Sequence, residues 1–110
     1  MAITQKLIES TFGTNNPVFT AAENVAITTI HLCNLASGEP AVINIYLLPN
    51  DGSTTTPTEN NKIYNTLSIS ASDTYVIDTE KLILSTGDKL YIEHPDSTAQ
   101  VVATISTIGL

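Results

Sequence analysis

Hydrophobic residues recur along this chain in short alternating runs, and clusters of Gly, Pro, Asn, Asp and Ser separate the runs. Alternation with a period of two predicts half-buried β-strands. We expect strands or short strand-like elements over residues 3–8, 17–22, 25–34, 41–48, 62–70, 74–79, 80–84, 89–93 and 99–108. Turn signals at intervals of about 8 to 12 residues are typical of antiparallel sandwiches. The sequence therefore predicts an all-β chain, a single antiparallel β-sandwich of about eight strands that is immunoglobulin-like or jelly-roll-like.

Several of these runs also predict which side chains share a face. Residues 41–48 are the most apolar run, which indicates a central strand covered on both sides. Leu90 and Ile92 are expected to point inward, and residues 101, 103 and 105 are expected to share one face. For two other runs strict alternation predicts the shared faces Val25, Ile27, Thr29, His31 and Cys33, and Ile63, Asn65, Leu67 and Ile69.

The chain divides into a short N-terminal part and one domain. We expect residues 1–16 to form an N-terminal arm or a first strand, because the turn cluster at residues 11–17 separates them from the rest. Residues 17–110 form the β-sandwich domain. The Thr-rich segment 53–61 offers nothing to pack, so it is expected to be an exposed, mobile loop.

Composition supports the β assignment and excludes some classes of binding partner. Of 110 residues, 36 are β-branched (13 Ile, 6 Val and 17 Thr), and such side chains favour strands over helices. Eleven Asp and Glu against four Lys and no Arg give a net charge of −7. This balance argues against nucleic acid or an anionic membrane as a partner.

Targeting and disulfide signals are also missing from the sequence. No apolar run approaches the length of about 18 residues that a membrane helix needs, and the N-terminus lacks the pattern of a signal peptide. We expect a soluble product made inside the cell. A single cysteine excludes an intramolecular disulfide.

Candidate catalytic and metal-binding residues are few. His31 and Cys33 are two apart and would share a strand face, but zinc would need two more ligands and only His94 remains. Cys33 is expected to be a small buried hydrophobe. We predict no catalytic residues, no metal site and no cofactor, and the chain is not expected to be an enzyme.

Two further groups invite a functional interpretation. Asp73, Asp78 and Glu80 are the densest acidic group, and carboxylates can serve acid–base catalysis or bind calcium. Their positions at turns and strand ends favour backbone capping and a solvated surface instead. Tyrosines could form a sugar-binding platform, but without Trp they more often pack on sheets. The tyrosines are Tyr46, Tyr64, Tyr75 and Tyr91.

The apolar content points to docking. The strands at 25–34 and 99–108 are apolar on both faces, which is more than a small sandwich hides, so we expect a homo-oligomer or a docking surface. The N-terminal segment could add a strand to a neighbour. Its apolar residues Ile3, Leu7 and Ile8 are the predicted partner-binding residues.

The order of several segments resembles a known family. Residues 17–24, 28–34 and 42–49, followed by 61–65, 78–84 and 87–90, occur in the order and spacing of small virion proteins of tailed phages. The resemblance covers residues 17 to 108, and such sandwiches serve as capsid decoration, neck and tail components. No binding residue is transferred, because no family binding motif is matched.

The resemblance implies a phage virion structural protein. Within that class we expect a capsid decoration (cement) protein, made in the host cytoplasm and located on the capsid surface, whose partners are the major capsid protein or other virion proteins. A neck, tail or baseplate accessory is the alternative within the class. A carbohydrate-binding module for host adsorption is the alternative from another class.

Overall fold

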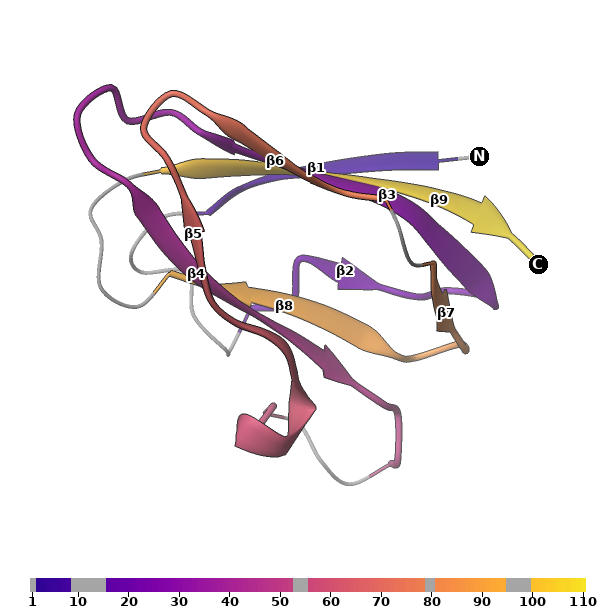
Figure 1. Cartoon of the computed structure of the whole chain (residues 1–110). Coiled ribbons are helices and arrows are strands. Elements are labelled where there is room, and N and C mark those ends of the chain that lie inside the picture. The colour runs from indigo at the N-terminus through magenta and orange to yellow at the C-terminus, as the bar shows by residue number, and fades with distance from the viewer. Residues whose placement is uncertain (1, 9–15, 53–55, 79–80, 95–99) are drawn as a thin grey trace.

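The computed structural model describes residues 2–8, 16–52, 56–78, 81–94 and 100–110. These residues contain nine strands and one 3-10 turn, shown in Figure 1. The strands are β1 (Ala2–Ile8), β2 (Phe19–Thr20), β3 (Val25–Asn34), β4 (Ala41–Leu48), β5 (Lys62–Ile69), β6 (Thr74–Ile77), β7 (Leu82–Leu84), β8 (Lys89–Glu93) and β9 (Val101–Gly109), and the turn is η1 (Glu59–Asn61).

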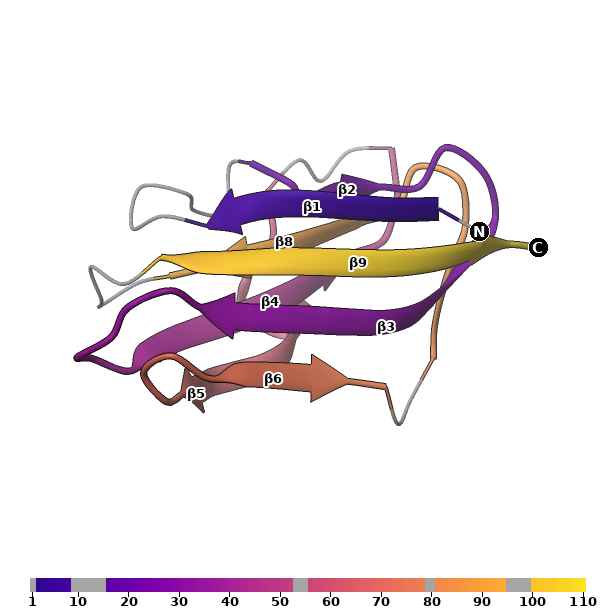
Figure 2. The ribbon, with the colours of Figure 1, turned by 90° about the horizontal axis from the view of Figure 1, so that it is seen from above.

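The strands form two antiparallel sheets packed face to face. The first, called sheet A here, has the order β1-β9-β3-β6, with β7 also paired to β3. The second, sheet B, has the order β2-β8-β4-β5. Figure 2 looks onto the outer side of sheet A, with sheet B behind it. The predicted antiparallel β-sandwich is confirmed, with nine strands in place of about eight.

Aliphatic side chains from both sheets fill the space between them. Sheet A contributes Ile30, Leu32 and Ile105, and sheet B contributes Ile43 and Ile45, all at most 1% exposed. The predicted inward residues Leu90 and Ile92 are also fully buried. Residues 101, 103 and 105 share one face as expected, because alternation holds along that part of β9, and this face points inward.

A β-bulge changes the faces of β3. Ile27 pairs with Thr107, but the next paired residue is Thr29, opposite Ser106, so Thr28 is an extra residue. Val25 and Ile27 therefore point inward, while Thr29, His31 and Cys33 lie on the opposite face. The single shared face predicted for residues 25–33 is wrong, because an inserted residue reverses the alternation.

A second irregularity lies in β5. Thr66 has a positive φ of 57°, and its N–H donates to Asn44 Oδ1 at 2.8 Å. The register shifts there, so that Ile43 pairs with Leu67 but Ile45 pairs with Tyr64. Tyr64 packs against the core, while Ile63 and Asn65 are exposed. The predicted face is therefore confirmed for Leu67 and Ile69 and wrong for Ile63 and Asn65, which precede the irregularity.

Strand β4 is covered on both sides, as predicted. Its inner residues enter the main core, while Tyr46 and Leu48 are buried on the outer side of sheet B together with Tyr91. The chain after β4 turns back so that η1 contacts β4 (Figure 1).

The segment that contains η1 agrees with the predicted exposure of residues 53–61 in part. Residues 56 and 58–60 are exposed, but Pro57 is buried, Asn61 N–H donates to the Thr58 carbonyl at 2.9 Å, and Thr58 N–H donates to Asn61 Oδ1 at 2.8 Å. The prediction missed this turn because the Asn61 side chain stabilises it through a backbone hydrogen bond without apolar content. Residues 53–55 lie outside the described part of the chain.

Candidate docking surface

The outer side of sheet A is a continuous surface built from five strands. Register places alternate residues of each strand in cross-strand rows on this side, for example Leu7, Val102 and Cys33. We call this surface the outer face of sheet A. It consists of Ile3, Gln5 and Leu7 from β1; Val102, Thr104, Ser106 and Ile108 from β9; Ala26, Thr29, His31 and Cys33 from β3; Thr74 and Val76 from β6; and Ile83 from β7.

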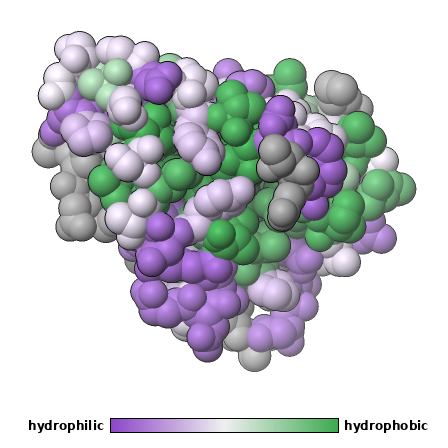
Figure 3. All heavy atoms as spheres, viewed as in Figure 1, coloured by the Kyte–Doolittle hydropathy of each residue, from purple (hydrophilic) through white to green (hydrophobic). Residues whose placement is uncertain are grey.

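Large apolar side chains on this face are open to solvent. Ile3 is 65% exposed and Ile83 is 62% exposed. Leu7, Val76 and Ile108 are also exposed. In Figure 3 hydrophobic residues reach the surface toward β7 and the C-terminus, whereas hydrophilic residues gather around η1. Apolar surface of this kind marks interaction sites when it is contiguous.

The same face carries no Asp, Glu or Lys among its strand residues, although the chain has a net charge of −7. Its polar members are hydroxyl and amide groups, together with His31. Gln5 Nε2 donates to Thr104 Oγ1 at 3.1 Å across two strands. A partner can therefore cover this face without desolvating a formal carboxylate or ammonium charge of the strands.

The predicted partner-binding residues are divided by the structure. Ile3 and Leu7 lie on the outer face of sheet A, whereas Ile8 is fully buried in the core. All seven residues of β1 pair with β9. A partner can contact Ile3 and Leu7 while β1 remains in its sheet, but contact with Ile8 would require β1 to leave the sandwich.

His31 and Cys33 lie side by side on the outer face of sheet A. Cys33 is partly exposed and unpaired, so the expectation of a buried cysteine is wrong. The bulge at Thr28 explains the error, because it moves residues 29, 31 and 33 to the outer face. No group of three or more potential metal ligands occurs among the residues that the structure describes.

The acidic group predicted at Asp73, Asp78 and Glu80 is only partly described. Asp73 Oδ1 accepts the Thr74 N–H at 2.9 Å, which is the backbone capping expected of a turn aspartate. The carbonyl of Asp78 accepts a hydrogen bond from Lys81 Nζ at 2.8 Å. Glu80 lies outside the described residues.

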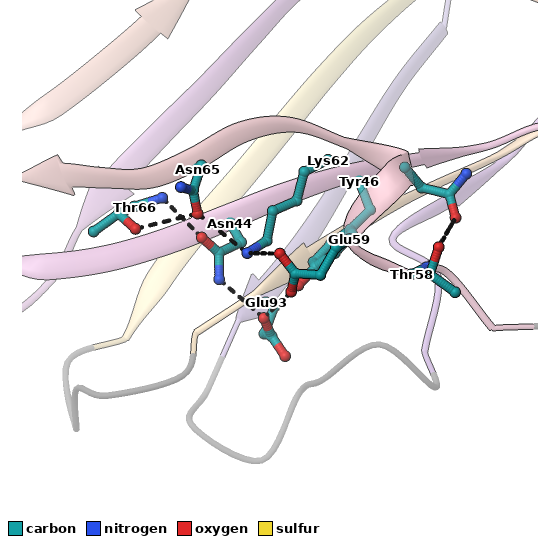
Figure 4. A network of polar contacts seen from close by, with 9 residues as sticks. Asn44, Tyr46, Thr58, Glu59, Lys62, Asn65, Thr66 and Glu93 are labelled. Carbon is teal, nitrogen blue, oxygen red and sulfur yellow. Dashed lines mark hydrogen bonds and ion pairs between the residues drawn. The ribbon is translucent and has the colours of Figure 1, made fainter.

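A polar network occupies the outer side of sheet B, as Figure 4 shows. Glu93 Oε1 accepts hydrogen bonds from Tyr46 Oη at 2.8 Å and from Asn44 Nδ2 at 3.0 Å. Lys62 Nζ lies 2.9 Å from Glu59 Oε2 and 5.8 Å from the centroid of the Tyr46 ring. Glu59 belongs to η1, so this network ties the covering turn to the sheet.

Burial changes the acid–base properties of the two tyrosines in this region. Burial and the Glu93 carboxylate raise the pKa of Tyr46 well above its ordinary value of 10.0. Burial alone raises the pKa of Tyr91. Tyr46 therefore remains a neutral donor to Glu93 at neutral pH.

The tyrosines do not form the sugar platform weighed from the sequence. Tyr46 and Tyr91 are cross-strand partners, but both side chains are buried. Tyr75 is exposed, and it belongs to the other sheet. Tyr64 packs against the core. Stacking on sugar rings requires exposed aromatic faces, which Tyr46 and Tyr91 do not offer.

The sequence analysis considers His94 only as a possible metal ligand and gives no sign of its burial. Its side chain is 1% exposed, and neither ring nitrogen has a hydrogen-bond partner among the described residues. Continued alternation after Leu90 and Ile92 was the available signal, because it places residue 94 on the same inward face.

Comparisons with known proteins bear on the fold alone. The chain matches no protein-family model and no curated protein sequence. It is similar to a chain in the structure "Acidic stable capsid structure of Helicobacter pylori bacteriophage KHP30", with a TM-score of 0.55 and 10% sequence identity. The match covers 97% of this chain and 90% of that chain. The likeness therefore extends over the whole sandwich, and the two chains are similar in length.

Among the described residues, no helix is long and apolar enough to cross a membrane.

Proposed function

We propose that this chain is a phage virion structural protein that acts by binding other virion proteins and not by catalysis. The observation that carries the proposal is the outer face of sheet A, which exposes large apolar side chains on both sides of a band of Thr, Ser, Gln and His residues and carries no Asp, Glu or Lys on its strands. The fold it shares with a chain in a phage capsid structure supports the same interpretation.

Within that class we propose a capsid decoration (cement) role. The chain would sit on the outer capsid and connect neighbouring major capsid subunits through the outer face of sheet A. Ile3 and Leu7 would contact the partner, and the free edge of β1 would be available for strand addition. A protein that binds only the expanded capsid lattice stabilises that lattice by mass action.

Charge supports the orientation. The strand residues on the outer face of sheet A include no Asp or Glu, so a chain docked through this face would keep the exposed Glu59 of η1, beside sheet B, in solvent. Repulsion between neighbouring copies would then act across water, where salt screens it. The proposed location is the capsid surface of the virion, after synthesis in the host cytoplasm.

Self-association through the same face is part of this proposal. A second copy offers an equally uncharged apolar surface, so two such faces can pack without burying formal charges. Sedimentation velocity of the purified chain at several concentrations measures this directly. A concentration-dependent shift to a larger species that the variant Ile83→Lys abolishes would support a homo-oligomer, and a monomer at all concentrations would exclude it.

The copy number of the chain in purified particles tests the proposed role. Quantitative mass spectrometry gives the ratio of this chain to the major capsid protein. The proposal expects about one copy per capsid subunit, or a simple fraction of that ratio. A few per cent would place the protein in the neck, tail or baseplate, and absence from particles would contradict a virion role.

A further inference from the structure

A cavity of about 310 Å³ opens at one end of the sandwich, where the start of β1, strand β2 and the end of β9 meet. Its apolar wall comes from Ala2, Phe19, Ala22 and Val25. Glu23 is the charged residue of the lining, and Thr20, Thr107 and Gly109 complete it. This volume is at the lower end of the range of ligand pockets, about 300 to 1,000 Å³, and suits one extended side chain.

The Glu23 carboxylate lies directly against Gly109. A methyl group added to Gly109 would lie 2.6 Å from Glu23 Oε1, so a side chain at position 109 would displace the carboxylate. Adjacent backbone contacts fix the segment, because Leu110 N–H donates to the Asn24 carbonyl at 2.9 Å and Thr86 N–H donates to Asn24 Oδ1 at 3.2 Å.

Glu23 forms no ion pair and no hydrogen bond among the described residues. A carboxylate without a cation, at the rim of a mostly apolar cavity, matches an amphipathic cation. The four-carbon stem of a lysine side chain can lie along the apolar wall while its ammonium group reaches the carboxylate.

We propose that this cavity binds the lysine side chain of a docked protein partner, with the stem against Phe19 and Val25 and the ammonium group paired with Glu23. The identity of the partner as another virion protein rests on the proposed function. The cavity opens at the end of the sandwich where β1 starts, and Ala2 lines it from the inward side of β1, whereas the neighbouring Ile3 belongs to the outer face of sheet A. A partner seated on that face could reach the cavity by extending around the start of β1.

The test uses the whole chain and two small probes that differ by one charge. N-acetyl-lysine methylamide carries the ammonium group, and N-acetyl-norleucine methylamide has a similar stem without it. Amide chemical shifts of the isotope-labelled chain are followed by NMR during titration with each probe. We expect saturable shifts at Phe19, Glu23 and Gly109 with the lysine probe at millimolar concentration, and weaker binding of the norleucine probe.

Two variants locate the interaction and a third controls for charge. Glu23→Gln removes the charge while keeping the shape, and Gly109→Ala displaces the carboxylate. Each is expected to weaken lysine-probe binding roughly two- to fivefold, as for one exposed ion pair. Glu59→Gln removes the same charge elsewhere and should leave binding unchanged.

Equal binding of both probes, unchanged lysine-probe binding in Glu23→Gln, or shifts confined to other residues would overturn the proposal. The titration needs no virus particle, so its result is independent of the copy number that tests the proposed function. A chain that binds the probe but is absent from particles would retain the lysine site and lose the virion role.

Discussion

The two outer faces of this sandwich differ in how deeply their apolar side chains are buried. On sheet B, the outer residues Tyr46, Leu48 and Tyr91 are buried, and the chain's own turn η1 contacts the sheet. On sheet A, the equivalent side is open, and Ile3 and Ile83 are more than half exposed. A small sandwich can thus bury the apolar residues on one outer face, while those on the other outer face remain open to a partner.

The two outer faces also differ in the charged residues that they carry. The sheet B face concentrates charge in a satisfied network, in which Glu93 accepts two hydrogen bonds and Lys62 pairs with Glu59. The sheet A face has none of the chain's Asp, Glu or Lys on its strands. Fixed charges with internal partners stabilise a covered face, whereas an uncharged face loses little when a partner removes its water.

The largest expected effect concerns the covered face. Leu48→Ala truncates a side chain that is buried on the outer side of sheet B. We expect the free energy of unfolding to fall by about 2 to 5 kcal/mol. Urea denaturation measures it. A change below 1 kcal/mol, which is small for a buried leucine, would show that the cover is loose and that the two faces are less different than described.

A smaller fall in the free energy of unfolding is expected when the polar network on the same face loses a hydrogen bond. Tyr46→Phe removes the hydroxyl that donates to Glu93 and keeps the ring. The loss should be about 1.5 to 3 kcal/mol, as for a hydrogen bond to a charged group. Glu93→Gln in the same denaturation experiment shows whether the loss depends on the carboxylate charge. Wild-type stability in Tyr46→Phe would mean that this hydrogen bond contributes nothing.

Alkaline pH should lower the free energy of unfolding through Tyr46 and Tyr91, the two buried tyrosines on the outer side of sheet B. Burial raises the pKa of Tyr46 and of Tyr91 above 10.0 in the folded chain. The unfolded chain therefore releases these protons at lower pH, so the free energy of unfolding is retained below about pH 10 and falls as pH rises above it. Unfolding curves between pH 8 and pH 11 should show this fall, and Tyr46→Phe combined with Tyr91→Phe should reduce its slope. An unchanged slope would contradict burial of the two hydroxyl groups.

The smallest effect on stability is expected on the open face. Ile83→Thr changes a side chain that is 62% exposed, so the free energy of unfolding should change by less than about 0.5 kcal/mol. The same denaturation series provides the comparison with Leu48→Ala. A loss as large as that of Leu48→Ala would mean that Ile83 is covered within the isolated chain.

Strand positions were predictable from the sequence because β-branched runs alternate between turn signals. The side of the sheet that each side chain faces was less predictable. An inserted residue such as Thr28, or a positive φ at Thr66, cannot be recognised in a Thr-rich sequence. The exposure of Cys33 and the inward position of Tyr64 both follow from these bulges. Local periodicity carries no information about where alternation restarts.

The candidate site was predictable in part. Excess apolar surface on the strands at 25–34 and 99–108 indicated docking, and Ile3 and Leu7 lie on the exposed face. Ile8 does not, because it follows the inward alternation of β1. The contact of Glu23 with Gly109 joins residues far apart in the chain, so no sequence pattern could indicate it.

Particle occupancy of surface variants tests the central claim most directly. Leu7→Lys places a charge on the outer face of sheet A, and Thr56→Lys places the same charge at an exposed position near the cover of sheet B. Both variants and the wild-type chain are added to particles that lack the protein, and bound copies are counted by mass spectrometry. The proposed role predicts wild-type occupancy for Thr56→Lys and at least a tenfold loss for Leu7→Lys, the ratio given by about 1.4 kcal/mol. Equal occupancy of the two variants would contradict docking through sheet A.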